Sequence, residues 1–311
     1  YLFARVAVES EFVDYGGTCG NLASAAAQFA IEEGLVVGSG EYAEVRIHAV
    51  NTGQIIVARV PLRAGHARYD GDLTIPGVSG SGAPIRLAFL DPDGSRTGRL
   101  LPSGHAVDML RIAPGGTIAA SLIDASNPCV FVAAQDLGLT GAELPGELDA
   151  DLRTKQRLES TRAAAGVRMG LGRTSDEISR ASQSSPKIAV VAPPVDMPTL
   201  DRGKLNAEAM DLAVRMISMG QAHRAIPLTG ALCTAVAAVI PATIVSAAMF
   251  PAARQRGELR IGTPSGVVSV AANMTTHDGE MRTESAVAYR TARRLMEGLV
   301  LVPDNDPGRE I

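Results

Sequence analysis

The sequence predicts an α/β fold made of two similar halves, each with strands wrapped around a central, buried helix. Two observations carry this prediction. Short runs of β-branched and apolar residues alternate with longer helical stretches, and Gly, Pro and Asp separate them. Two Ala-rich helical stretches each open at a cysteine, Cys19 in the first half and Cys233 in the second.

The two halves are related by an internal repeat with an offset of 214 residues. The sequence Glu-Val-Arg-Ile begins at Glu44, 25 residues after Cys19, and Glu-Leu-Arg-Ile begins at Glu258, 25 residues after Cys233. Each tetrad leads into a Gly-containing turn and then into an apolar, strand-like run. Because the same spacing joins a helix to a strand pair twice, we predict a repeated structural unit with both cysteines at helix N-termini.

The individual elements follow from local periodicity. Strands are predicted where β-branched or alternating residues occur, at 45–50, 55–60, 85–90, 118–122, 130–133, 188–192 and 267–271. Helices are predicted at 20–33, 148–169, 204–219, 231–240 and 284–297, the last ending at Gly298 as a C-cap. The polar stretch 170–186 is predicted to be a loop.

Two segments bear on the setting of the chain. The stretch 231–250 carries no charged residue and is long enough to span a bilayer. Pro241 interrupts it and Ala dominates it, so a buried core helix is predicted instead of a membrane span. The chain opens with a strand-like run from Tyr1 and has no signal peptide, so we expect it to start inside a domain.

Length and composition narrow the class of protein. The chain has 311 residues, which at about 100–200 residues per domain predicts two domains. We place them at 1–105 and 106–290, with a return segment at 291–311 packing on the first. A net charge of −4 and 4% aromatic residues disfavour nucleic-acid binding. An odd number of cysteines, three, predicts a cytoplasmic protein without disulfides.

Cys19 is the best catalytic candidate from the residues alone. Gly16, Gly17 and Gly20 surround it ahead of an apolar helix, and glycine lets a ligand approach the backbone. A helix N-terminus offers free N–H groups and a positive dipole end, which bind carboxylates and favour a thiolate for acid–base chemistry. The alternative is a buried structural cysteine in an N-cap turn.

Further motifs follow one another along nearly the whole chain. They are Phe-Val-Asp-Tyr at 12–15 leading into Cys-Gly-Asn at 19–21, Phe-Ala-Ile-Glu-Glu-Gly-Leu-Val at 29–36, Leu-Leu-Pro-Ser-Gly at 100–104, Asn-Pro at 127–128, Pro-Leu-Thr-Gly-Ala at 227–231, Gly-Thr-Pro-Ser-Gly at 262–266 and Arg-Thr-Ala-Arg-Arg-Leu-Met-Glu-Gly at 290–298. In this order they resemble the diaminopimelate-epimerase-like superfamily and, more narrowly, the PrpF family.

The resemblance implies an isomerase or tautomerase of small unsaturated di- or tricarboxylic acids. Family activities include isomerisation of 2-methylaconitate and methylitaconate and tautomerisation of 4-oxalomesaconate. The resemblance also implies two similar α/β domains with the active site between them, and no metal or organic cofactor. The expected base of the family is a lysine in a Gly-rich N-terminal segment, and no lysine of this chain lies in such a motif. We therefore expect that segment to precede Tyr1.

The resemblance and the helix-terminus argument together give the candidate site. The predicted catalytic residues are Cys19 and Cys233, and the predicted substrate-binding residues are Gly20, Asn21, Asn127, His223, Thr234, Thr263, Ser265 and Gly266. For His223 and Asn127 a structural role as loop residues weighs equally. Arg290 and Arg293 are predicted on one helix face, where a solvated or salt-bridged role is favoured over carboxylate binding.

Two other functions remain open at this point. One is a two-cysteine racemase or epimerase of the same fold, with Cys19 and Cys233 on opposite faces of the substrate. The other is a catalytically impaired accessory protein that binds a polycarboxylate. The predicted partner is in each case a small molecule, with no nucleic acid and no membrane, and a homodimer is left open.

Overall fold

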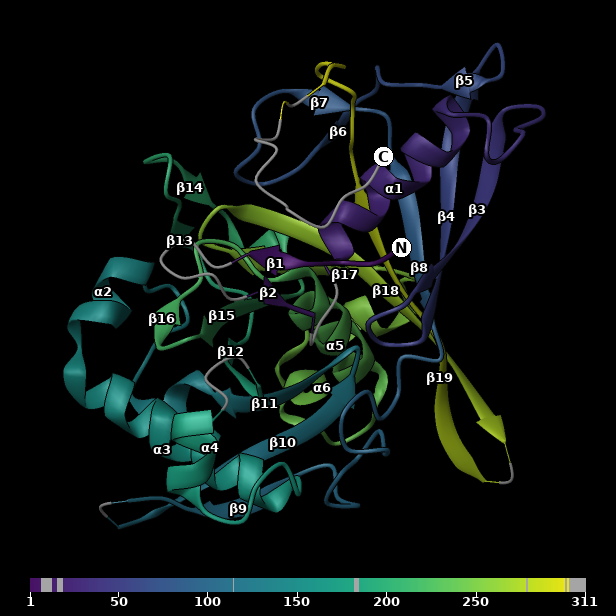
Figure 1. The fold of residues 1–311 in the computed structure, drawn as a ribbon. Helices are drawn as coiled ribbons and strands as arrows, with labels where there is room; N and C mark the ends of the chain where they lie inside the picture. Colours follow the sequence, from purple (N-terminus) through teal and green to yellow (C-terminus); the bar gives the residue numbers. More distant parts are fainter. Residues whose placement is uncertain are drawn as a thin grey trace.

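The computed structural model describes residues 1–6, 13–15, 19–113, 115–181, 185–277, 279–299 and 301. Within them, thirteen strands form one large mixed sheet, and three two-stranded sheets lie beside it (Figure 1). The large sheet runs in the order β3 (Tyr42–Ala49), β4 (Gln54–Arg63), β8 (Ile85–Leu90), β19 (Glu280–Arg290), β18 (Gly266–His277), β17 (Leu259–Thr263), β15 (Leu212–Ser218), β12 (Lys187–Ala192), β11 (Asn127–Ala133), β10 (Thr117–Ala125) and β9 (Asp108–Arg111).

The remaining strands are short. They are β16 (Gln221–Ala222) on β15, β5 (His66–Ala67) on β4, and the pairs β1 (Arg5–Val6) with β2 (Val13–Asp14), β6 (Leu73–Thr74) with β7 (Ser81–Gly82), and β13 (Met197–Pro198) with β14 (Lys204–Leu205). The helices are α1 (Gly20–Glu32), α2 (Pro145–Ala150), α3 (Leu152–Arg168), α4 (Ser175–Ala181), α5 (Leu228–Val239) and α6 (Ile244–Ala248), with 3₁₀ turns at η1 (Ala134–Leu137), η2 (Ala207–Ala209) and η3 (Pro251–Gln255).

The helices cover the two faces of the large sheet. α5 packs against β10, β11, β17, β18 and β19, and α1 packs against β3, β4 and β8 (Figure 1). α3 packs on β9, β10 and β12. Since successive side chains of a strand point to opposite faces, β11 contributes to two cores: Cys129 and Phe131 enter the cluster around α5, and Val130 and Val132 enter the cluster under α3.

The internal repeat is present as a structural unit. A helix is followed by an antiparallel hairpin twice, as α1 with β3–β4 and as α5 with β17–β18. The repeated tetrads lie at equivalent places, because Ile47 pairs with Ile56 in the first hairpin and Ile261 pairs with Val268 in the second. The predicted strands at 45–50, 55–60 and 267–271 are thereby confirmed.

The predicted position of Cys233 at a helix N-terminus is wrong. α1 begins at Gly20 with Cys19 as its N-cap, as predicted, whereas α5 begins at Leu228, five residues before Cys233. The physical reason lies in the residues before the cysteine. Pro227 is well suited to a helix start, and the apolar side chains that follow it pack into the core, so the helix extends further toward the N-terminus.

Two predicted helices are strands. The segment 284–297 forms β19 up to Arg290 and has no regular structure from 291 to 299. Its even-numbered residues Ala286 and Ala288 are buried because β19 is paired on both sides, with β18 and β8. The segment 204–219 forms β14, η2 and β15, and β15 is almost wholly buried between β12 and β17. The predicted loop at 170–186 contains α4.

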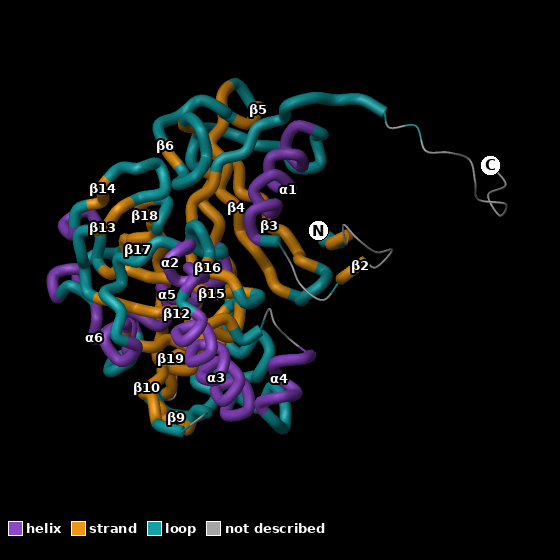
Figure 2. The backbone as a smooth tube through the Cα atoms, turned by 90° about the vertical axis from the view of Figure 1, so that its left-hand side faces the viewer, coloured by secondary structure: helices purple, strands orange, loops and turns teal. Residues whose placement is uncertain are grey.

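The uncharged stretch 231–250 lies in α5 and α6 and is largely buried, as predicted. Among the residues described, no helix combines the length and apolar character needed to cross a membrane. The segment after β19 contacts α1, because Gln28 Nε2 donates a hydrogen bond to the carbonyl of Ala292 (2.9 Å). Figure 2 shows it running past α1 and extending away from the body. The division into domains at 105 and 290 stays a prediction.

Candidate functional site

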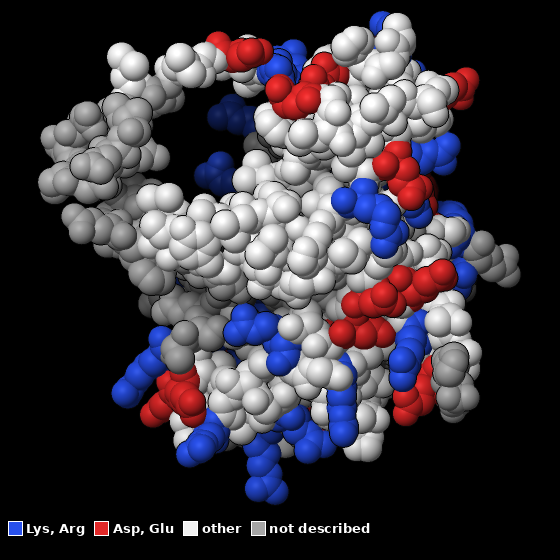
Figure 3. Space-filling model, turned by 45° about the vertical axis from the view of Figure 1, so that its right-hand side comes forward, with Lys and Arg blue, Asp and Glu red and all other residues white. Residues whose placement is uncertain are grey.

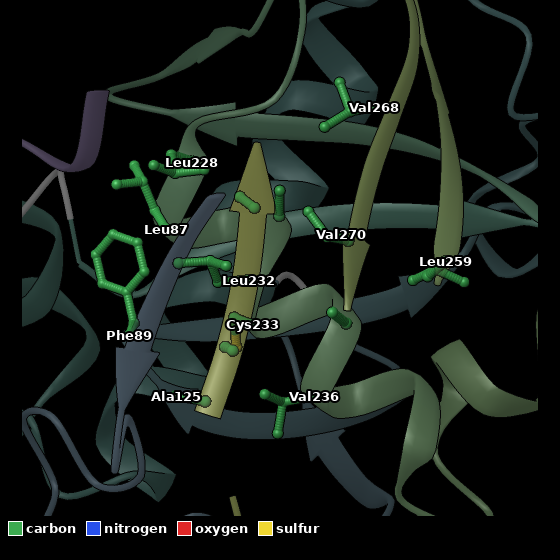
Figure 4. Packing of buried hydrophobic residues seen from close by; sticks show 14 of the residues in the cluster. Leu87, Phe89, Ala125, Leu228, Leu232, Cys233, Val236, Leu259, Val268 and Val270 are labelled. Atoms are coloured by element: carbon green, nitrogen blue, oxygen red, sulfur yellow. The ribbon is translucent and has the colours of Figure 1, made fainter. Parts of the chain in front are cut away.

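The N-termini of α1 and α5 meet in the structure. A Cβ atom on Gly20 would lie 2.5 Å from Leu228 Cδ2 and 3.1 Å from Phe89 Cζ. Figure 4 shows Leu228 grouped with Leu87 and Phe89 beside α5. Only glycine allows the first turn of α1 to approach α5 this closely, and this gives Gly20 a packing role at the point where the two helix ends converge.

Cys19 lies at this junction and is partly buried. It is the N-cap of α1 with extended backbone angles, and its carbonyl accepts hydrogen bonds from Ala23 N–H (3.3 Å) and the Tyr1 hydroxyl (3.1 Å). In the described part of the chain, neither α1 nor α5 has an acidic side chain in its first turn or a side-chain N-cap bond. The positive ends of both helix dipoles are therefore not neutralised by these helices themselves.

His223 lies on the segment that leads into α5. Its backbone N–H donates to the Met216 carbonyl (2.8 Å), and Met216 packs on the first turn of α5 at Gly230. The imidazole is exposed on the surface overall, but partial desolvation and the charge of Lys187 lower the pKa of His223. A neutral imidazole at pH 7 can accept a proton and can also donate one hydrogen bond.

Asn127 lies at the same edge of the sheet as His223. It begins β11, and the parallel pairing of Cys129 with Lys187 places the start of β11 beside the start of β12. Lys187 in turn acts on His223. The Asn127 side chain donates through Nδ2 to the Pro128 carbonyl (2.9 Å). Its amide is thus engaged locally, as expected of a turn residue.

The turn between β17 and β18 contacts the segment leading into α5. Ser265 Oγ donates to the Arg224 carbonyl (2.8 Å), and the fully buried Thr263 donates to the carbonyl of Gly266 (2.8 Å). Gly266 has a φ of 126°, and a Cβ there would lie 3.5 Å from Pro76. The turn is therefore shaped by Thr263 and brings Ser265 and Gly266 next to the N-terminal side of α5.

Cys233 and Thr234 lie apart from these residues, inside α5. Both are fully buried; Thr234 Oγ1 donates to the Gly230 carbonyl (2.8 Å) and Cys233 Sγ donates to the Ile123 carbonyl (3.6 Å). Burial, with a contribution from Cys129, raises the pKa of Cys233. Figure 4 shows Cys233 among apolar side chains. The structure thus holds Cys233 as a protonated core thiol.

Arg290 is a site neighbour that the sequence did not place here. It ends β19, and its Nε donates to Asn21 Oδ1 in the first turn of α1 (2.8 Å) while Nη1 donates to the Tyr289 carbonyl (2.7 Å). Burial lowers the pKa of Arg290. The predicted helix would have shared Arg290 and Arg293 on one face, whereas Arg293 lies exposed in the extended segment. The one available signal was its motif at 290–298.

Other parts of the described chain offer less chemistry. No group of three or more His, Cys, Asp or Glu side chains is close enough to hold a metal ion in the described residues. A cavity of about 290 Å³ lies between α2, α3 and β16, lined mainly by apolar side chains such as Leu148, Ile188 and Ile217. None of the predicted site residues lines it, and it lacks the converging polar groups of the helix junction.

Known proteins resemble this chain over most of its length. A sequence model of the family described as "PrpF protein" matches residues 1–303. The chain is 37% identical over 310 residues to the 2-methyl-aconitate isomerase of Shewanella oneidensis, covering 97% of this chain and 77% of that protein. It is 38% identical over 306 residues to the 3-methylitaconate isomerase of Eubacterium barkeri, covering 97% and 78%.

Two further matches agree with these. The chain is 37% identical over 302 residues to the (4E)-oxalomesaconate Delta-isomerase of Novosphingobium sp., covering 97% of this chain and 77% of that protein. The crystal structure of a methylitaconate-delta-isomerase superposes with a TM-score of 0.87 at 36% identity, covering 96% of this chain and 76% of that one. The predicted fold class is confirmed, and these matches show that the chain belongs to the PrpF family.

Proposed function

We propose that this protein is an isomerase that moves a proton and a carbon–carbon double bond within a small unsaturated di- or tricarboxylic acid. Three relatives named as isomerases act, by their names, on 2-methyl-aconitate, 3-methylitaconate and (4E)-oxalomesaconate. The observation that carries the proposal is the convergence of Cys19 and Gly20 at the N-terminus of α1 with the first turn of α5. The three cysteines, free in the structure, support a cytoplasmic setting.

The chemistry needs a site for negative charge. Removal of a proton next to an unsaturated acid group delocalises charge over the double bond and the carboxylate, and its return at the far carbon moves the double bond. Fixed N–H dipoles stabilise such developing charge because they need no reorganisation during the reaction. The first turns of α1 and α5 supply these dipoles, and Gly20 and Gly266 leave the backbone accessible.

Cys19 is the residue we assign to proton transfer. Its position as N-cap puts the thiol at the positive end of α1, where a thiolate is stabilised and can accept or return a proton. Cys233 takes no part in this proposal because it is fully buried. Asn127, His223, Ser265 and Gly266 stay candidate substrate-binding residues around α5. The buried, internally bonded Thr234 and Thr263 are given positioning roles.

The test is proton exchange in D₂O. Purified protein is incubated with cis- and trans-aconitate, 2-methylaconitate and 4-oxalomesaconate, and vinyl and methylene protons are followed by NMR. Deuterium incorporation or double-bond migration that disappears in Cys19→Ser supports the proposal. A folded protein that exchanges no proton of any of these acids overturns it. Exchange of an amino-acid α-proton, lost in both Cys19→Ser and Cys233→Ser, would instead support the racemase.

A further inference from the structure

Arg290 occupies an electrostatically unfavourable position. Its guanidinium contacts Asn21, which belongs to the first turn of α1, so a positive side chain lies at the positive end of a helix dipole. Burial also disfavours its charge, as the lowered pKa of Arg290 reflects. A protein keeps a charged group in such a place only if something else compensates for it.

The described residues of the chain do not provide that compensation. None of their carboxylates forms an ion pair with Arg290, whose two hydrogen bonds go to the neutral oxygens of Asn21 and Tyr289. A nearby arginine is arranged differently. Arg294 pairs with Glu33 from α1 and with Glu297 (3.2 Å). Two arginines four residues apart on one segment therefore differ in whether the protein itself neutralises them.

The geometry leaves donor groups of Arg290 available. A guanidinium has five N–H donors in a fixed fork, and the two bonds above use Nε and one donor of Nη1. Nη2 makes no hydrogen bond to the described residues and is not among their buried, unsatisfied atoms. The bond to Asn21 fixes the plane of the fork, and a carboxylate can accept two parallel N–H bonds from such a fork.

We propose that Arg290, oriented by Asn21, binds one carboxylate of the substrate and so selects for polycarboxylic acids. This inference rests on the proposed function for the identity of the substrate, but not for the anion site itself. Arg290 is a substrate-binding residue in this scheme, and Asn21 is a positioning residue that holds the guanidinium without neutralising it. An aspartate at position 21 would neutralise it permanently.

The decisive variant is Asn21→Asp. An acid in the first turn of α1 and beside Arg290 is favourable for folding, so a purely structural contact predicts equal or higher thermal stability and unchanged ligand binding. Our proposal predicts the same stability but at least a tenfold weaker binding, because the new carboxylate competes for Arg290. Arg290→Gln should weaken binding similarly and Arg290→Lys less. Arg293→Gln, which removes an exposed charge nearby, is the matched control.

Two readouts separate this inference from the proposed function. Calorimetric titration with tricarballylate, a saturated tricarboxylate that lacks the double bond, measures the anion site without turnover. Binding that is lost in Asn21→Asp and Arg290→Gln but kept in Arg293→Gln supports the inference even if no acid is isomerised. Absence of binding to the wild-type protein, or equal binding to Asn21→Asp, overturns it. If turnover occurs, a raised KM with little change in kcat is the expected kinetic signature.

Discussion

α1 and α5 begin the same helix–hairpin unit but occupy different environments. Ten of the twelve residues of α5 are buried, against six of the thirteen residues of α1. α5 has strands around it, from β10 and β11 to β17, β18 and β19, whereas α1 packs on β3, β4 and β8. The buried residues of α1 accordingly follow one stripe, Gly20, Ala23, Ser24, Ala27, Gln28 and Ile31.

The difference between the two helices separates two cysteines that the repeat makes equivalent. Cys19 caps α1 and is partly buried, while Cys233 lies in the second turn of α5 at 0% exposure. An enclosed helix can begin earlier, because its extra residues gain burial. A duplicated sequence pattern can thus preserve strands and spacing without preserving the place of a thiol relative to the helix end.

Replacing each cysteine tests this contrast most directly. We expect Cys19→Ser to lower kcat by about 10²–10⁴-fold, the usual contribution of a general acid or base, while the protein stays folded. Cys233→Ala should keep the activity of the folded fraction. Steady-state kinetics with the acid identified by NMR, together with circular dichroism, provide the measurement. Equal loss of activity in both variants would contradict the assignment of different roles.

The junction between the helices should be sensitive to one methyl group. In Gly20→Ala the new Cβ lies 2.5 Å from Leu228 Cδ2, so one helix must shift. Overpacking of this kind costs about 1–3 kcal/mol in unfolding free energy, and the shift also displaces the N–H groups of α1. Urea denaturation measures the first effect and kcat/KM the second.

The control is Gly146→Ala, since a Cβ at Gly146 in α2 meets no atom within 4 Å. It should be neutral or slightly stabilising. Adding Leu228→Ala to Gly20→Ala should recover part of the activity by making room. An undamaged Gly20→Ala variant would show that α1 does not depend on close contact with α5.

Local sequence patterns were sufficient for part of the fold. The strand predicted at 85–90 has the bounds of β8, and the helix predicted at 20–33 differs from α1 by one residue. Alternation and β-branched residues are properties of a few neighbouring residues, so they can be recognised without the partner strands. The repeat carried the same information over a longer range and gave both helix–hairpin units.

The failures share a physical cause, which is dependence on distant residues. β19 contains the helix-compatible run Ala286, Val287 and Ala288, and its pairing with β8 and β18 decides its conformation. The bond between Arg290 and Asn21 joins residues 269 positions apart. No spacing rule reaches that far, and for this reason the candidate site could be predicted at Cys19, Gly20 and Asn21 but not at Arg290.

The core thiol of α5 should matter for stability. In Cys233→Ser a hydroxyl replaces a fully buried thiol among apolar side chains, although it can still donate to the Ile123 carbonyl. We expect a loss of about 1–2 kcal/mol in unfolding free energy, within the usual range for core substitutions. Cys19→Ser should change it by less than about 0.5 kcal/mol. Urea titration at constant pH compares the two, and the opposite ranking would contradict the burial contrast.

The smallest expected effect concerns His223, at the entrance to α5. Desolvation and Lys187 lower its pKa in the folded protein, so between the folded pKa and about 6.5 the unfolded chain binds more protons. Stability from this group is therefore full above about pH 6.5 and is lost as the pH falls below it. His223→Gln should flatten the decrease in urea midpoint between about pH 7.5 and 5.5. His105→Gln, at an exposed loop position, is the matched control; if both variants keep the wild-type slope, the charge environment assigned to His223 is wrong.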